Sequence, residues 1–208
     1  MIKLHNILDI SEKIKLSEDS KIIILGCGLS DHKTVGNNHI LSNLEKLIIF
    51  NNIIFSDINN KYLCQNMELP IQDWFKLKAE KNKLFSSHLT GSNLNVIYDS
   101  QFMKILEDNK LFKKNDLTKL PNNFSDFDLI QIRYVLHFVD INKRLEIIND
   151  IFNNMSLNSY LCVKLYFEFA PNNEYIPFSE NELNTYRIRF PTLEYDYEEN
   201  SINFFLKK

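Results

Sequence analysis

The chain has 208 residues and a formal net charge of −3, with 44% hydrophobic and 12% aromatic residues. This length suits one domain with a sizeable core, and the apolar content excludes a mainly disordered chain. The small net charge excludes a global basic field for nucleic acid or an anionic membrane. No run approaches the roughly 18–20 apolar residues of a membrane-spanning helix.

The N-terminus and the cysteines favour a cytoplasmic protein. The segment MIKLHNILDI lacks the apolar core followed by small residues that marks a signal peptide. Cys27, Cys64 and Cys162 are far apart, odd in number and without metal-ligand spacing. We therefore expect a reduced, cytoplasmic chain that binds no metal and is not attached to a membrane.

The first third of the chain predicts a βαβ unit. Residues 3–16 have the apolar spacing of a short amphipathic helix. Residues 21–25 (KIIIL) form a run of β-branched residues that ends at a glycine, which is typical of a buried parallel strand. Helical spacing over residues 38–50 and a second apolar run over residues 52–57 complete the unit.

The middle of the chain is less regular. Residues 59–69 and 71–79 have helical patterns, and Pro70 is well placed between them. A short helix is expected at residues 101–106. We interpret about residues 59–110 as a helical insertion.

Alternation of strands and helices returns in the second half. Strands are predicted at residues 111–116, 127–132 and 159–167. Between the last two, residues 141–155 predict an amphipathic helix whose apolar face carries Ile141, Leu145, Ile148 and Phe152.

The C-terminus has a different character. Residues 180–186 predict a helix that begins after Ser179, with Glu182 completing a capping box. Residues 192–197 and 201–206 predict an antiparallel hairpin. The whole pattern indicates an α/β fold: a Rossmann-like three-layer sandwich with a mostly parallel seven-stranded sheet and an antiparallel C-terminal hairpin.

Gly26, Cys27 and Gly28 directly follow the most apolar predicted strand. Glycines at the carboxyl end of such a strand let a nucleotide-type ligand approach the backbone. Asp57 ends the next strand, where a carboxylate can accept both hydroxyls of a ribose. The alternatives are a tight turn for the glycines and a solvated acid for Asp57.

The same pattern also suits NAD, but Asp31 stands where the third glycine of a GxGxxG motif is expected. A carboxylate there would repel a diphosphate. S-adenosylmethionine (SAM) has no phosphate and carries a positive sulfonium. The sequence therefore favours SAM over NAD.

The chain resembles the class I SAM-dependent methyltransferases over about residues 20–168. The similarity lies in the order of GCG, a strand-end acid, D-L-x-x-L-P, F-D-L-I and x-x-V-L-H. It implies that Asp116 meets the adenine amino group and that the backbone N–H of Leu117 donates to the adenine ring. Cofactor contacts are expected for Gly26, Cys27, Gly28, Asp57, Ile58, Asp116, Leu117 and Ile132.

Two weaker likenesses and two departures accompany this resemblance. Residues 178–208 are similar to the tail of tellurite-resistance-type small methyltransferases, and IQIRYVLHF has some likeness to cap guanine-N7 methyltransferases. The usual Pro-Gly-Gly turn is replaced by residues 156–159 (SLNS), in which Asn158 can adopt a left-handed conformation. The insertion is long and contains Trp74, which is either a substrate-pocket residue or an anchor for an extra helix.

Candidate substrate-side residues follow the predicted strand at 127–132. Arg133 and Tyr134 lie nearest the methyl group in the geometry that the resemblance implies. His137 is a general base, a substrate ligand or a structural residue. Lys13 and Lys15 are candidates for the methionine carboxylate.

We therefore expect residues 1–208 to form a single SAM-binding methyltransferase domain that acts on a small molecule or a nucleotide or RNA end. One alternative is a catalytically inactive SAM-fold protein that binds or stimulates a partner. A second is an NAD-dependent oxidoreductase. The sequence leaves a protein partner and the oligomeric state open.

Overall fold

The structure, a computed structural model, describes residues 13–17, 19–26, 52–57, 112–170 and 173–208. The chain divides into two compact units, Met1–Asp19 with Cys27–Lys114, and Ser20–Gly26 with Asn115–Lys208. In the first unit, strands β2 (Asn52–Asp57) and β3 (Phe112–Lys114) pair in parallel. The predicted helix at 38–50 and the insertion at 59–110 lie outside the described residues.

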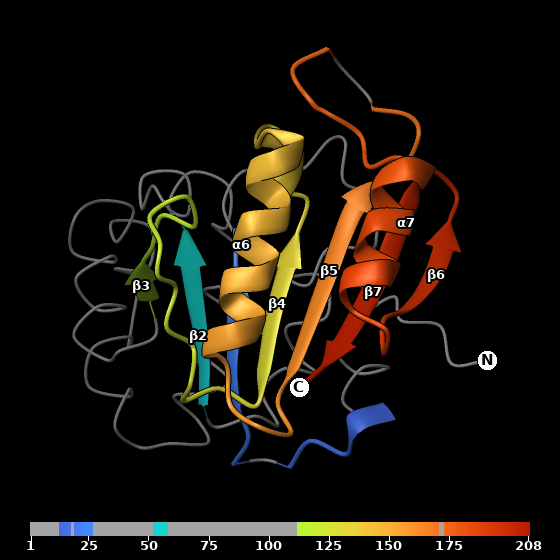
Figure 1. Cartoon of the computed structure of the whole chain (residues 1–208). Helices are drawn as coiled ribbons and strands as arrows, with labels where there is room; N and C mark the ends of the chain where they lie inside the picture. Colours follow the sequence, from blue (N-terminus) through green and yellow to red (C-terminus); the bar gives the residue numbers. More distant parts are fainter. Residues whose placement is uncertain (1–12, 18, 27–51, 58–111, 171–172) are drawn as a thin grey trace, which may run out of the picture. The chain divides into compact units, whose positions relative to one another are not determined.

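The second unit contains a sheet whose strands follow the order β1 (Lys21–Leu25), β4 (Leu129–Arg133), β5 (Tyr160–Tyr166), β7 (Ser201–Lys207) and β6 (Glu194–Glu198), seen in Figure 1. The pairs β1–β4 and β4–β5 are parallel, whereas β5–β7 and β7–β6 are antiparallel. The mixed sheet with its C-terminal hairpin is thus confirmed. Of the seven strands expected, five build this sheet, and β2 and β3 form the pair of the first unit.

The inner strands are apolar because they are buried on both faces. All four residues after Lys21 in β1 are buried, as are the five central residues of β5. At the start of β1, the Lys21 N–H donates to the Asp128 carboxylate (2.8 Å), and the Asp128 N–H donates to the Lys21 carbonyl (2.8 Å). This pair of hydrogen bonds aligns the first residues of β1 and β4.

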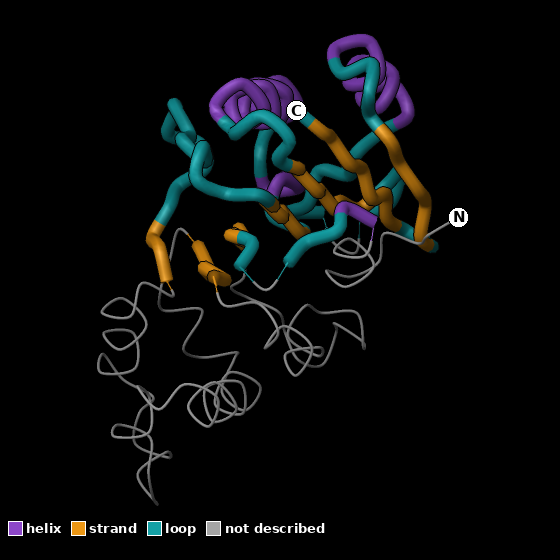
Figure 2. The backbone as a smooth tube through the Cα atoms, turned by 90° about the horizontal axis from the view of Figure 1, so that it is seen from below, coloured by secondary structure: helices purple, strands orange, loops and turns teal. Residues whose placement is uncertain are grey.

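Helices α6 (Ile141–Asn154) and α7 (Glu180–Arg189) lie on the same face of this sheet, as Figures 1 and 2 show. This is one helical layer of the expected three-layer sandwich. The predicted apolar face of α6 is partly wrong, because Ile141 is 44% exposed. The buried residues of α6 are Arg144, Ile147, Ile148 and Ile151. A stripe about 100° wide fits either set of positions, so periodicity alone could not choose between them.

Two local predictions are confirmed. The Ser179 hydroxyl caps α7 by accepting the N–H of Glu182 (3.2 Å). Asn158 has φ 67°, in the left-handed region, so asparagine completes the turn before β5.

Within the stretches that the structure describes, no helix combines the length and apolar character needed to cross a membrane.

Candidate functional site

The carboxyl ends of β1, β4 and β5 meet at one edge of the sheet because the three strands are parallel. Leu25 at the end of β1 lies opposite Ile132 of β4. Gly26 follows with φ 69°, and a Cβ there would lie 1.6 Å from Cγ2 of Val135. This position therefore requires glycine both for its backbone angle and for the close approach of the Val135 side chain.

Asp116 and Leu117 form a turn after β3. The Asp116 carboxylate accepts the N–H (3.0 Å) and the hydroxyl (2.7 Å) of Thr118. The Thr118 hydroxyl, chiefly, lowers the pKa of Asp116, so this carboxyl group is ionised at neutral pH. Leu117 is buried, and its carbonyl accepts the side-chain amide of Asn122 (3.1 Å).

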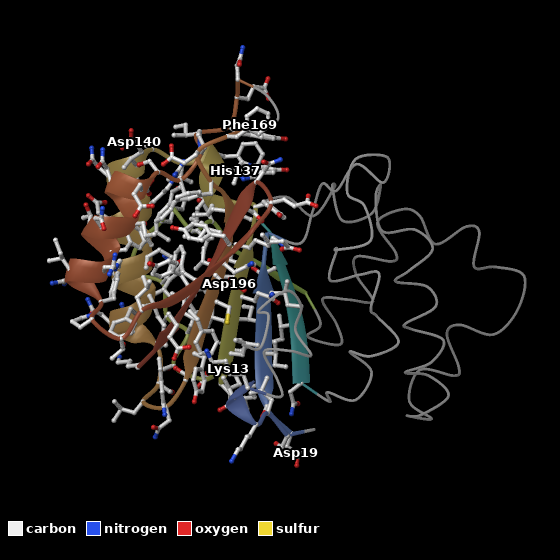
Figure 3. All side chains as sticks on the ribbon, turned by 90° about the vertical axis from the view of Figure 1, so that its right-hand side faces the viewer. Lys13, Asp19, His137, Asp140, Phe169 and Asp196 are labelled. Atoms are coloured by element: carbon white, nitrogen blue, oxygen red, sulfur yellow. The ribbon has the colours of Figure 1, made fainter. Side chains whose placement is uncertain are left out.

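An aromatic cluster occupies the same edge of the sheet and consists of Tyr134, His137, Phe138, Tyr166 and Tyr175. His137 is central: its ring centroid lies 4.2 Å from that of Tyr175 and 4.3 Å from that of Phe138. The rings of Tyr166 and Tyr175 are nearly parallel at 5.7 Å. Figure 3 labels His137 and Phe169, and both lie at this end of the sheet.

The backbone around Tyr134 is unusual. Tyr134 has φ 50°, a region that bulky side chains seldom adopt, and its N–H donates to the Lys164 carbonyl (2.9 Å). In this conformation the Tyr134 ring contacts the Tyr166 ring, and the two ring centroids are 4.7 Å apart. The buried Lys164 ammonium lies over the Tyr134 ring, 5.6 Å from its centroid, and forms an ion pair with Glu198. Strain of this kind concentrates at functional sites.

His137 is only 3% exposed, and its Nδ1 has no hydrogen-bond partner among the residues that the structure describes. Burial, and secondarily the charge of Arg144, lower the pKa of His137 to about 4. The imidazole is therefore neutral at physiological pH. Burial also raises the pKa of Tyr166, so this phenol keeps its proton.

Arg144 of α6 connects the backbone segments that carry the aromatic cluster. It is fully buried, and its Nε donates to the carbonyls of Leu136 (2.8 Å) and Val139 (2.9 Å). Its Nη1 pairs with the Glu182 carboxylate (3.1 Å), and its Nη2 donates to the Ile176 carbonyl. Since these carbonyls flank His137 and Tyr175, Arg144 fixes the two segments that bring those rings together.

Solved structures share this architecture. The methyltransferase domain of bacterial CtHen1-CN is 13% identical with a TM-score of 0.54, over 97% of this chain and 95% of that one. The fold is that of the SAM-dependent methyltransferases. Magnesium protoporphyrin IX methyltransferase (ChlM) from Synechocystis PCC 6803, solved with bound S-adenosylhomocysteine (SAH), is 10% identical with a TM-score of 0.53, over 97% of this chain and 80% of that one. TehB from Haemophilus influenzae is 15% identical with a TM-score of 0.51, over 97% of this chain and 61% of that one.

At the level of sequence, no family model and no curated protein matches the chain. The expected Rossmann-like methyltransferase fold is therefore supported by structure alone.

Within this methyltransferase fold, the structure brings some of the predicted site residues together. Gly26 lies one residue beyond the Leu25–Ile132 pair, and the rings of Tyr134 and His137 are 6.3 Å apart. Arg133 ends β4 opposite Lys164. Asp116 does not end a strand as predicted, because β3 stops at Lys114 and a turn follows.

The remaining site predictions are not tested. Asp57 ends β2 in the first unit. Cys27, Gly28, Ile58 and Trp74 lie outside the described residues. Their assignments stay predictions from the sequence.

The sequence does not single out Tyr166, Tyr175 or Arg144, and it includes Val135 only as part of the x-x-V-L-H motif. One signal for Tyr166 was available, since it ends a strand whose carboxyl end faces the expected ligand. One signal for Arg144 was also available, because it shares a helical stripe with the apolar Ile147, Ile148 and Ile151. A charge in such a stripe indicates a buried, paired group.

We expect His137 to make folding sensitive to acid. Because its pKa is about 4 when folded and 6.5 ordinarily, the unfolded chain binds the proton first as the pH falls. Stability is then lost between about pH 6.5 and pH 4, by up to about 3 kcal/mol, and this contribution levels off below pH 4. Urea denaturation of the wild type and of His137→Gln across this range measures the difference. Equal pH dependence of the two proteins would contradict the burial of a neutral imidazole.

Proposed function

We propose that this chain is a SAM-dependent methyltransferase whose cofactor site begins at the Gly26 turn. The observation that carries the proposal is the Gly26 turn itself, with its positive φ and its contact with Val135, at the carboxyl end of β1 in a methyltransferase fold. Open α/β sheets bind ligands at the carboxyl ends of their strands. The bound SAH of the similar ChlM structure agrees with this choice of cofactor.

The proposed cofactor residues divide by the part of SAM that each would hold. We assign Gly26, Cys27 and Gly28 to the methionine half, where they would let the ligand approach the backbone, and Asp57 with Ile58 would take the ribose. The ionised carboxylate of Asp116 suits the amino group of adenine as a hydrogen-bond acceptor. The backbone N–H of Leu117 would donate to the adenine ring, and the buried Ile132 would line the same side of the cofactor.

Bound SAM would supply a methyl group already activated by its sulfonium, so the protein's task is mainly to orient the acceptor and exclude water. Tyr134 and His137 at the end of β4 would contact the acceptor, as would Arg133. The lowered pKa of about 4 makes His137 a weak base at neutral pH, and methyl transfer does not require a base. We propose a small molecule or a nucleotide or RNA end as the acceptor.

Calorimetric titration of the full chain with SAM and SAH tests the cofactor site. We expect both to bind, and Asp57→Ala to weaken binding by about 10- to 150-fold, the equivalent of about 1.5–3 kcal/mol for a charged hydrogen bond. Asp126→Ala, which removes an exposed acid before β4, is the matched control and should bind as the wild type does.

The outcomes separate the alternatives. Absence of SAM binding at millimolar ligand would overturn the proposal, and saturable binding of NADH would instead support an oxidoreductase. SAM binding without methyl transfer to any acceptor would favour a catalytically inactive SAM-fold protein.

A further inference from the structure

One side of the aromatic cluster is exposed to solvent, so packing in the core does not account for the apolar residues there. Phe138 is 58% exposed, although it contacts both His137 and Tyr175. Phe169 (57% exposed) and Ile176 (38% exposed) lie at the same end of the sheet, and the Ile176 N–H donates to the His137 carbonyl (2.8 Å). A group of large apolar side chains exposed to solvent commonly marks a binding surface.

The geometry of the exposed rings suits another flat ring. Phe138 and Tyr175 are perpendicular, with centroids 5.0 Å apart, so together they form a corner with one ring face and one ring edge. Aromatic rings favour stacked and edge-to-face contacts, and this corner offers both. Tyr166 stacks behind Tyr175 and keeps its ring in place.

The charges near the cluster argue against an ionic ligand. Lys164 already pairs with Glu198 and lies over the Tyr134 ring, where it would repel a second cation. Arg144 already pairs with Glu182 and backbone carbonyls, so it does not serve as an anion site. His137 is neutral at physiological pH.

His137 supplies the polar contact that would orient such a ring. His137 is buried (3% exposed) among aromatic rings, and within the described part of the chain its Nδ1 lacks a hydrogen-bond partner. A buried polar atom without a hydrogen bond is costly, so a ligand group that bonds to it would gain affinity and a fixed direction.

We propose that the methyl acceptor presents a neutral planar aromatic or heteroaromatic ring, bound in the corner of Phe138 and Tyr175 and oriented by His137. This inference rests on the proposed function, because it places the acceptor beside the Gly26 turn: Tyr134 immediately precedes Val135, whose side chain fills that turn. A free aromatic compound and the base of a nucleotide share the required chemistry.

Four probes are titrated separately into the full chain saturated with SAH, and ligand-observed NMR monitors the binding of each probe. Quinoline represents a free ring and guanosine a base on a sugar, while choline and ribose 5-phosphate represent a cation and an anion. We expect quinoline or guanosine to bind, and the one that binds more tightly identifies the source of the ring. Choline and ribose 5-phosphate should not bind.

Variants locate the site. Phe138→Leu and Tyr175→Leu keep apolar volume but remove a ring, and each should weaken binding by about 5- to 100-fold, as loss of a stacking partner does. Tyr195→Leu is the matched control, because Tyr195 is an exposed tyrosine (37%) on β6 and is not a member of the cluster. Phe138 is mostly exposed, so Phe138→Leu should melt at the wild-type temperature and report on binding alone.

The outcomes distinguish this inference from the proposed function. If SAM and SAH bind but neither ring does, or if Phe138→Leu and Tyr195→Leu behave alike, the ring site is wrong and the cofactor site stands. Tighter binding of choline or ribose 5-phosphate would equally overturn it. If SAH does not bind, the same titrations without SAH still test the ring site, while the proposed function fails.

Discussion

Replacing Gly26 by alanine is expected to destabilise the protein by about 2–5 kcal/mol. A left-handed φ costs a residue with a Cβ about 1–2 kcal/mol, and forcing a methyl group into a filled space costs about 1–3 kcal/mol more. Here φ is 69°, and the new Cβ would lie 1.6 Å from Cγ2 and 2.9 Å from Cβ of Val135. Urea denaturation measures the loss.

A double-mutant cycle with Val135→Ala separates the two causes. That substitution removes both methyl groups of Val135, and therefore the contact at 1.6 Å, but it leaves the contact at 2.9 Å and the strained φ. We expect the double variant to be more stable than the sum of the single changes predicts, by about 1–2 kcal/mol. Additive effects would show that the backbone angle alone sets the cost, and a Gly26→Ala variant of wild-type stability would contradict the turn.

The elements that the sequence predicted well are those that local rules determine. Residues 21–25 and 52–57 are strands with the predicted bounds, because unbroken apolar runs flanked by turn residues have few alternatives. The start of α7 follows from the hydroxyl of Ser179, and the turn before β5 from the tolerance of asparagine for positive φ.

The site was predictable only where it follows the order of the strands. The glycine after β1 needs no knowledge of its neighbours, whereas the space it requires is filled by Val135, more than a hundred positions later in the chain. The aromatic cluster combines the end of β4, the 3-10 turn Leu136–Phe138, the end of β5 and the loop at Tyr175. A composition rich in tyrosine and phenylalanine hides such a cluster, since no spacing relates its members.

Arg144 shows why the sequence pattern does not reveal the buried polar network. An arginine between Lys143 and Leu145 reads as part of a charged helix surface, and the stripe of Ile141, Leu145, Ile148 and Phe152 seems complete without it. The actual stripe is rotated, which places Arg144 at its centre. Only tertiary structure supplies the carbonyls of Leu136, Val139 and Ile176 that make this burial tolerable.

Arg144→Met is expected to destabilise the protein by about 3–5 kcal/mol, as removal of one partner from a buried ion pair does. Methionine preserves the apolar stem but leaves the carboxylate of Glu182 without its counter-ion and several carbonyls without donors. Lys143→Met is the matched control. It removes the neighbouring charge, whose ion pair with Glu146 is exposed, and should change stability by less than about 1 kcal/mol.

The pH dependence identifies the cause of the loss from Arg144→Met. Burial raises the pKa of Glu182, and Arg144 opposes that rise. Without Arg144 the pKa of the folded protein rises further above the ordinary glutamate value of 4.5, so the folded state holds a proton that the unfolded state releases. Stability of the variant then falls as the pH rises above about 4.5, and urea denaturation should show a larger loss at pH 8 than at pH 5.

Adding Glu182→Gln removes the uncompensated charge and should recover part of the stability at pH 8. An equal loss at both pH values, with no recovery in the double variant, would mean that Arg144 acts through its carbonyl contacts and not through Glu182.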